Sequence, residues 1–306
     1  MSDRARDPLV AARELSLALA SLAPAVPGIE VSVERPPSVA LARFRLGQVP
    51  AQGWSPSLAF VGRRAVGKSS LALALAGFAS TGGDLAASVS EVPGGGTVLA
   101  YDTPGLRAAG RPHLRAQLRD ALAADPPDLL LAVFSVTEVD AGVDDDVEDL
   151  LALSRAWTPR RGPPPAIIAV LHRIDELPPF DLDPAPSDPD RALAIATATR
   201  VLRARLAPLD GLCPIVTTAV IGASLDPVAA RSVHGHVRAL LAQRLRTPRA
   251  RAAAFERCLD GLRRAEGGEA YAQLRRGWQA LDDRARMILL HPRGWAAETS
   301  GRSEPG

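Results

Sequence analysis

The sequence has no asparagine and only one lysine, Lys68, although lysine and arginine together number 36. Aromatic residues make up only 4% of the chain, so the core must be built mainly from Ala, Leu and Val. Two cysteines, Cys213 and Cys258, do not provide a disulfide framework or the ligand spacing of a zinc site. A formal net charge of +2 is too small to indicate a nucleic-acid-binding protein by itself.

Long apolar runs are also missing. No run reaches the roughly 18 to 20 residues that a membrane-spanning helix needs. Arg13 and Glu14 interrupt the apolar part of the N-terminal stretch, which argues against a signal peptide. A chain of 306 residues with 47% hydrophobic and 23% charged residues has the composition of a globular protein. We therefore expect a cytoplasmic protein with one large domain and flanking segments.

Residues 56–246 alternate short apolar runs with helical patterns. Runs such as "LAFVG", "TVLAYDT", "LLLAVFSV" and "AIIAVLH" are typical of buried strands joined by helical crossovers. The stretch "ASVSEV-PGGG-TVLAY" is too short for a crossover and predicts a hairpin. The pattern therefore predicts an α/β three-layer sandwich, whose mostly parallel sheet has one antiparallel edge strand.

Residues 1–55 form a lead-in to this domain. Asp7 and Pro8 are a helix start signal, so we expect a helix to about Leu22. The following stretch "IEVSVERPPSVALARFRLG" is interpreted as two short extended runs, because two adjacent prolines interrupt it.

Residues 247–306 form an Arg-rich helical segment with a loose tail. Apolar residues spaced three and four apart predict two helices over residues 249–290, broken near Gly267 and Gly268. The N-terminal and C-terminal helices each have one apolar face, so we expect them to pack together.

The position of the single lysine explains its presence. Residues 62–69, "GRRAVGKS", fit the G-x-x-x-x-G-K-[ST] pattern, with a strand before it and a helix after it. Gly62 and Gly67 let the backbone amides face a phosphate, and the helix N-terminus adds its dipole. Lys68 reaches the β- and γ-phosphates as a point charge that the wider arginine head does not match. The hydroxyl of Ser69 is the expected Mg²⁺ ligand. The motif predicts a nucleoside triphosphate without choosing the base.

A second phosphate motif is "VLAYDTPGL", residues 98–106, at the end of an apolar strand. Asp102 is placed to hold Mg²⁺ through water, and the Gly105 amide is placed to sense the γ-phosphate. The same tetrapeptide is common turn chemistry, but its position after a strand favours the functional interpretation.

With these two motifs, residues 57–246 resemble the translation-factor-related P-loop GTPases of the Era/TrmE type. The resemblance rests on "GRRAVGKSS" and "DTPGL", and it implies a P-loop NTPase fold, GTP and GDP as ligands, Mg²⁺ as cofactor and slow hydrolysis of GTP to GDP in a molecular switch. It assigns phosphate positioning to Lys68, Asp102 and Gly105. It also implies a nucleotide cradle made of Gly62, Arg63, Arg64, Ala65, Val66, Gly67, Lys68, Ser69 and Ser70.

The base-reading motif of that family, N-K-x-D, is altered here. In "AIIAVLHRIDEL", Asp175 matches the aspartate that accepts two hydrogen bonds from guanine, and Arg173 can cover the base with its stem. His172 replaces the Asn, in a chain that has none. Thr218 and Ala219 occupy the place of the family's Ser-Ala pair, whose backbone touches the guanine oxygen.

The family's Mg²⁺ site includes a switch threonine before the hairpin, beside the ligands Ser69 and Asp102. Thr81 in "GFASTGGDLAASVSEV" is the first candidate for this residue, followed by Ser80 and Ser88. The resemblance implies that Thr81 completes the metal site.

Two positions depart from faster relatives. Leu106 stands where many small GTPases have a water-positioning Gln, so a low intrinsic rate is expected. Ala65 stands where potassium-stimulated relatives have Asn, which argues against potassium activation. Arg63 or Arg64 could act as an internal arginine finger, although a solvated loop charge is the plainer interpretation.

Other features suggest weaker hypotheses. The acidic run "VDDDVED" is interpreted as a helix start and not as a metal site. The "HGH" histidines lie at i and i+2 of a helix and do not face each other. The Arg-rich stretch from residue 244 could bind nucleic acid or an anionic membrane, but the favoured interpretation is the solvated face of a helix that packs on the main domain.

Two alternatives stay open at this point: a P-loop ATPase or kinase, and a dynamin-like, nucleotide-dependent scaffold at a membrane. The partners left open are an unidentified protein effector or activator and a second copy of the chain. No KH signature follows the GTPase-like region, so the resemblance to Era does not extend to ribosome binding.

Overall fold

The computed structural model describes most of the chain. The described residues are 8–23, 29–30, 37–77, 85–91, 96–103, 105, 112–124, 126–139, 143–157, 165–177, 188–209, 215–218, 220–221, 224–225, 227–245, 247–266 and 268–291.

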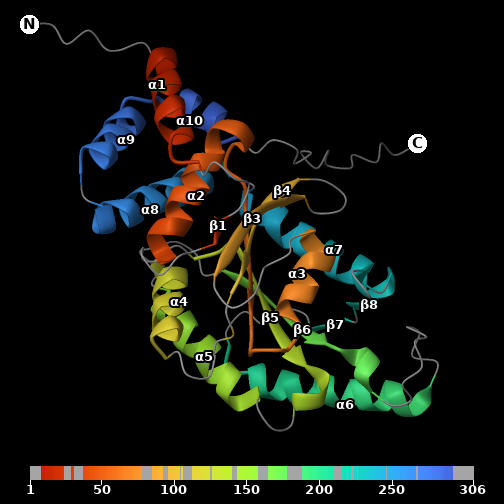
Figure 1. Ribbon diagram of the computed structural model, residues 1–306. Helices are drawn as coiled ribbons and strands as arrows, with labels where there is room; N and C mark the ends of the chain where they lie inside the picture. Colours follow the sequence, from red (N-terminus) through yellow and green to blue (C-terminus); the bar gives the residue numbers. More distant parts are fainter. Residues whose placement is uncertain are drawn as a thin grey trace, which may run out of the picture.

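A central sheet organises the molecule (Figure 1). Its strand order is β1-β3-β4-β2-β5-β6-β7, and β4, β2, β5, β6 and β7 run parallel. The bounds are β1 Ile29–Glu30, β2 Ser57–Val61, β3 Ala86–Glu91, β4 Thr97–Asp102, β5 Leu129–Ser135, β6 Ala166–His172 and β7 Ile215–Thr218. A separate pair, β8 (Val220–Ile221) and β9 (Ser224–Leu225), forms a two-stranded ribbon.

Strand β3 is the predicted antiparallel strand. It pairs with β4 from Ala86↔Asp102 to Glu91↔Thr97, so the hairpin prediction is confirmed. It is not the outermost strand, however, because the two-residue strand β1 pairs antiparallel with its outer side. Strand β1 has only two residues, which is too short for an alternating apolar pattern to reveal it in the sequence.

Helices cover both faces of the sheet. Helices α3 (Lys68–Ala76) and α7 (Pro227–Leu245) pack on one face, whereas α4 (Pro112–Ala124), α5 (Val143–Ala156) and α6 (Pro189–Leu206) pack on the other. Every residue of the central strands β2 and β5 is buried, which explains their continuous apolar runs. The predicted three-layer α/β sandwich is therefore confirmed.

The flanking helices form an apolar cluster separate from those on the two faces of the sheet, which we call the helical cluster. It contains α1 (Pro8–Ala20), one face of α2 (Pro37–Gln52), α8 (Pro248–Glu266), α9 (Glu269–Gln279) and α10 (Asp283–Leu289). Figure 1 shows α1, α8, α9 and α10 together, with α2 between them and the sheet. The expected packing of the N-terminal helix against the C-terminal helices is present.

Helix α2 corrects the prediction of extended structure after the two prolines. Pro37 occupies the first helical residue, where a missing N–H costs nothing. Leu41 and Phe44 then face the sheet, while Ala42 and Leu46 face the helical cluster. The apolar spacing of three and four was therefore a helix signal, divided between two opposite faces.

The C-terminal segment has three helices where two were predicted. The break near Gly267 and Gly268 is confirmed, because α8 ends at Glu266 and α9 begins at Glu269. A further helix, α10, follows because Asp282 caps it: the Asp282 side chain accepts a hydrogen bond of 2.7 Å from the Ala285 amide.

A buried arginine joins the helical cluster to the amino ends of the strands. The Arg45 Nη2 atom donates to the Asp128 carboxylate at 2.9 Å, and the same carboxylate accepts from the Ser57 amide at 2.8 Å. The Arg45 guanidinium also lies 4.2 Å from the Trp54 ring centre, and Trp54 contacts Phe255 edge-on. The start of β2 is thereby held to α8.

Among the helices that the structure describes, none is both long and apolar enough to cross a membrane.

Candidate functional site

The carboxyl ends of the five parallel strands meet at one edge of the sheet. Strand register places Asp102 beside Phe60, Ser135 beside His172, and His172 beside Thr218. Strand β2 lies between β4 and β5, and the helix that follows β2 (α3) packs on the opposite face of the sheet from the helices that follow β4 and β5 (α4 and α5). In α/β sheets, the crevice at such a point is where ligands bind.

The loop between β2 and α3 depends on its two glycines. Gly62 has φ 151°, and a Cβ atom there would lie 2.3 Å from the Val133 carbonyl oxygen. Gly67 has φ 93°, and its Cβ would lie 2.4 Å from the His172 ring. Ala65 adopts φ 66°, a conformation that costs a residue with a side chain about 1 to 2 kcal/mol. The loop is therefore a strained, tightly packed turn.

Helix α3 begins immediately after this loop. Its N-cap residue, Gly67, has no side chain to accept a hydrogen bond from the first helical amides. Ser69 and Ser70 are exposed in the first turn. The amides of this turn and the positive end of the helix dipole are thus directed toward the crevice, as anion binding requires.

Lys68 is buried inside the loop, with 6% of its surface exposed. Its Nζ atom donates to the Arg63 carbonyl oxygen at 2.6 Å, so the loop folds over its own lysine. Burial lowers the pKa of Lys68 to about 8, whereas the Asp102 and Asp146 carboxylates act in the opposite direction. The ammonium group is held close to the crevice with few polar partners, so a phosphate would relieve its desolvation.

Two of the three predicted magnesium ligands contact each other. The Ser69 hydroxyl donates to the Asp102 Oδ2 atom at 2.6 Å, across the crevice between α3 and β4. A hydroxyl and a carboxylate are hard oxygen donors of the kind that Mg²⁺ prefers. These residues fit the ion. The third predicted ligand, Thr81, lies outside the described residues.

Gly105 packs directly on the loop between β2 and α3, residues 62–67, which we call the phosphate loop after its predicted role. A Cβ atom on Gly105 would lie 2.4 Å from the Arg64 amide nitrogen and 2.8 Å from its Cα atom. The preceding Thr103 is fixed because its hydroxyl donates to the Phe60 carbonyl at 2.6 Å. The structure thus brings the two sequence motifs together. Leu106 lies outside the described residues.

The acidic run at the start of α5 binds arginines. The Arg63 Nε atom lies 2.9 Å from the Asp146 carboxylate, and its Nη2 atom lies 3.7 Å from Asp145. Asp144 pairs with Arg205 at 2.8 Å. The run was correctly interpreted as a helix start. Its contact with the phosphate loop was missed, because 83 residues separate Arg63 from Asp146.

His172 lies behind the phosphate loop. Only 2% of its surface is exposed; its ring faces the Gly67 Cα atom, and its Nδ1 atom is 2.8 Å from the Thr218 hydroxyl. Burial lowers the pKa of His172, whereas the Asp175 carboxylate and hydrogen bonding at Thr218 act to raise it. The imidazole therefore connects the loop to β7. A direct contact of His172 with a base stays a prediction.

Arg173 and Asp175 lie in the turn after β6. Arg173 has φ 65° and pairs with Glu176 at 3.2 Å. The Ile174 carbonyl accepts from the buried Arg191 at 2.8 Å, which holds the short helix Ile174–Glu176 in place. Asp175 is partly exposed at the same edge as Lys68. Sequence reasoning missed Arg191, which has no local pattern. Ala219 lies outside the described residues.

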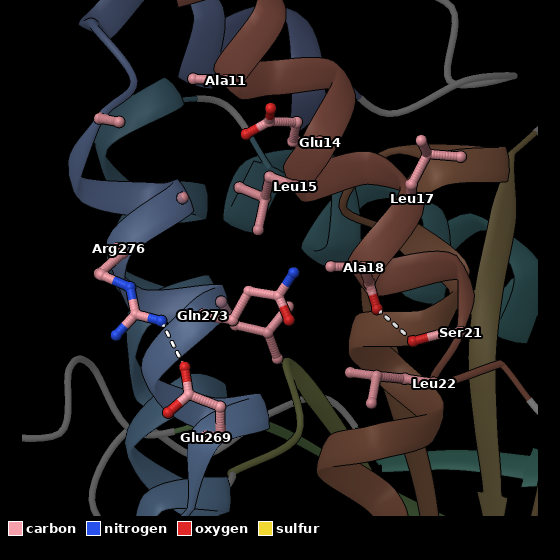
Figure 2. Close-up of a pocket in the computed structure, with 13 residues that line it drawn as sticks. Ala11, Glu14, Leu15, Leu17, Ala18, Ser21, Leu22, Glu269, Gln273 and Arg276 are labelled. Atoms are coloured by element: carbon pink, nitrogen blue, oxygen red, sulfur yellow. Dashed lines mark hydrogen bonds and ion pairs between the residues drawn. The ribbon is translucent and has the colours of Figure 1, made fainter. Parts of the chain in front are cut away.

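A groove of about 1130 Å³ lies in another part of the molecule, between α1 and α9 (Figure 2). Leucines from both helices line it, together with an ion pair of 2.6 Å between Glu269 and Arg276. It belongs to the helical cluster and contains none of the predicted site residues.

No protein-family model matches the sequence, and no curated protein matches it. Among solved structures, a bacterial selenocysteine-specific elongation factor EF-Sec is 18% identical, with a TM-score of 0.43 over 62% of this chain and 29% of that chain. A GTP-binding protein of Sulfolobus solfataricus in complex with GDP is 15% identical, with a TM-score of 0.43 over 79% and 68%. Era of Aquifex aeolicus is 18% identical, with a TM-score of 0.40 over 64% and 66%.

The chain spans less than a third of the elongation factor's length. At these TM-scores and identities, the likeness establishes neither a family nor an activity. The chemistry of this chain is therefore argued from its own residues.

Proposed function

We propose that the chain binds GTP with Mg²⁺ and slowly hydrolyses it to GDP, as a molecular switch. The observation that carries this proposal is the meeting of two sequence motifs at one sheet edge. Lys68 is buried under the loop, Ser69 contacts Asp102, and Gly105 packs on the loop. A triphosphate needs this combination of an ammonium group, oxygen ligands for a metal and free backbone amides.

Phosphate positioning is the catalytic principle of this proposal. The loop amides and Lys68 bind and orient the β- and γ-phosphates, while the Gly105 amide faces the γ-phosphate. Ser69 and Asp102 would hold Mg²⁺, with Thr81 as a third ligand, and the ion would supply neutralisation of the phosphate charge. Asp175 would accept hydrogen bonds from guanine, with Arg173 covering the base and Thr218 and Ala219 nearby.

The division of the chain follows from this proposal. Residues 56–246 would form the nucleotide-binding domain, and residues 1–55 and 247–306 would be its flanks. The helical cluster supports treating the two flanks as one unit, because α1 and α2 pack with α8, α9 and α10. A protein effector or a second copy of the chain would read the nucleotide state.

The test is a titration with fluorescent GDP, GTP and ATP analogues in the presence of Mg²⁺. The wild type should bind the guanine nucleotides and not ATP. Lys68→Ala should bind every nucleotide far more weakly, because the phosphates lose their buried cation. Asp175→Ala should lose the preference for guanine. Asp190→Ala, at an exposed aspartate in α6, is the matched control and should bind like the wild type.

Equal binding of ATP, together with indifference to Asp175→Ala, would contradict the assignment of guanine. That outcome would support the alternative of a P-loop ATPase or kinase. Binding by Lys68→Ala at wild-type affinity would contradict the phosphate site itself.

A further inference from the structure

The phosphate loop carries two adjacent arginines, which the structure treats differently. Arg63 is anchored: its guanidinium lies 2.9 Å from Asp146 and 3.7 Å from Asp145, and only 25% of its side chain is exposed. Its carbonyl oxygen also accepts the hydrogen bond from Lys68. Arg63 therefore holds the loop to α5, and its charge is already neutralised by two carboxylates.

Arg64 has no such anchor. Its side chain is exposed, and within the part of the chain that the structure describes its guanidinium makes no ion pair or hydrogen bond. Its backbone, however, is fixed. The Arg64 amide and Cα atoms are the ones that a Cβ on Gly105 would strike, at 2.4 Å and 2.8 Å. An exposed cation is thus carried on the backbone contact between the two phosphate motifs.

We propose that Arg64 is the catalytic residue that stabilises the transferred phosphoryl group, supplied within the same chain. This inference rests on the proposed function. The side chain at position 106 is an aliphatic leucine, which offers no hydrogen bond to an attacking water. A guanidinium group contributes to GTP hydrolysis in a different way, by stabilising the negative charge of the transition state. The planar fork of the guanidinium matches the geometry of phosphate oxygens.

In the step, the oxygen of a water molecule forms a bond to the γ-phosphorus. The bond between that phosphorus and the β,γ-bridging oxygen breaks, and its electron pair stays on GDP. One proton of the water remains on the inorganic phosphate, and the other is released to solvent. Arg64 donates hydrogen bonds to the γ-phosphate and bridging oxygens as negative charge moves onto the leaving group, and it keeps its own proton throughout.

The experiment compares single-turnover GTP hydrolysis in the wild type, Arg64→Ala, Arg64→Lys and Arg63→Ala. Arg64→Ala should bind fluorescent GDP within about threefold of the wild type, yet hydrolyse GTP at least about 100-fold more slowly. It should also lose stabilisation by GDP with aluminium fluoride, which mimics the transferred phosphoryl group. Arg64→Lys should recover only part of the rate, because lysine keeps the charge and lacks the fork.

Arg63→Ala should behave differently, with weaker GDP binding and a lower Tm, because the buried Asp146 carboxylate loses its ion pair with Arg63. Arg203→Ala, at an exposed arginine in α6, is the matched surface control and should match the wild type.

The inference is overturned if Arg64→Ala hydrolyses GTP at the wild-type rate while binding GDP normally, since Arg64 would then be a solvated loop charge. It is also overturned if the wild type binds GTP without hydrolysing it. Failure of the wild type to bind guanine nucleotides is a different result, because it would remove the proposed function together with this inference.

Discussion

The polar residues in the crevice form hydrogen bonds with one another that a bound ligand could replace. Lys68 is the clearest case, since its ammonium group is buried and its hydrogen bond goes to the loop's own Arg63 carbonyl. Ser69 and Asp102 likewise satisfy each other at 2.6 Å. Each of these polar groups has a hydrogen-bond partner within the protein when no ligand is bound. On binding, these protein partners would be replaced by the phosphates and the metal ion.

The charge of Lys68 makes nucleotide binding depend on pH. Its pKa of about 8 means that the free protein loses this cation as pH rises through about 8. Bound phosphate favours the charged form, so affinity should fall by up to tenfold for each pH unit above that value. Measuring the Kd of fluorescent GDP from pH 6.5 to 9.5 checks this. Lys68→Ala should bind weakly at every pH, and a flat profile in the wild type would contradict the prediction.

The lowered pKa of Lys68 has the opposite effect on the stability of the folded protein: stability rises with pH where affinity falls. The folded-state pKa of about 8 lies below the ordinary value of 10.5, so between these values the unfolded chain binds more protons than the folded one. The burial cost of the ammonium group is therefore present below about pH 8 and is relieved as pH rises toward 10.5. The nucleotide-free protein gains stability over the range in which it loses affinity.

At the scale of elements, the phosphate loop shows why some features could be predicted. Its two glycines, its lysine and its serine define a local backbone path, so eight consecutive residues carry the information. The same holds for the β3–β4 hairpin. Helix α2 was missed because its apolar residues divide between two partners that lie far away in the sequence. The ion pair of Arg63 with Asp146 was missed for the same reason, since it depends on how two loops meet.

The backbone of this loop is the feature that Gly67→Ala tests. Alanine there would need φ 93° and would place its Cβ 2.4 Å from the His172 ring. We expect a loss of more than about 1 kcal/mol of stability and a loss of GDP binding, because the loop must open. Thermal unfolding and GDP titration measure both effects.

The matched control is Gly235→Ala in α7, where a Cβ atom meets nothing within 4 Å. Alanine in a helix interior should be neutral or stabilising by up to about 1 kcal/mol. If Gly67→Ala bound GDP as well as Gly235→Ala does, the loop would not need its left-handed glycine.

At the scale of the whole molecule, helix α2 joins the helical cluster to the sheet. Helix α2 contributes Leu41 and Phe44 to the sheet core while its other face lies in the helical cluster. The rings of Trp54, Phe255 and Trp278 continue this contact; Trp54 meets Phe255 edge-on and Phe255 meets Trp278 tilted, with ring centroids 5.8 Å and 4.4 Å apart. Removing the central ring should therefore weaken the nucleotide-binding part as well as the flanks.

Phe255→Ala should destabilise the protein by about 3 to 5 kcal/mol, because the ring is fully buried and its cavity is lined by two tryptophans that cannot collapse onto each other. Urea unfolding followed by tryptophan fluorescence and by release of fluorescent GDP should give one shared transition, shifted to lower urea. Arg263→Ala, at an exposed position of the same helix, is the control and should leave the transition in place. A separate early transition of the helices, with GDP still bound, would show instead that the flanks unfold as an independent unit and that α2 does not couple them to the sheet.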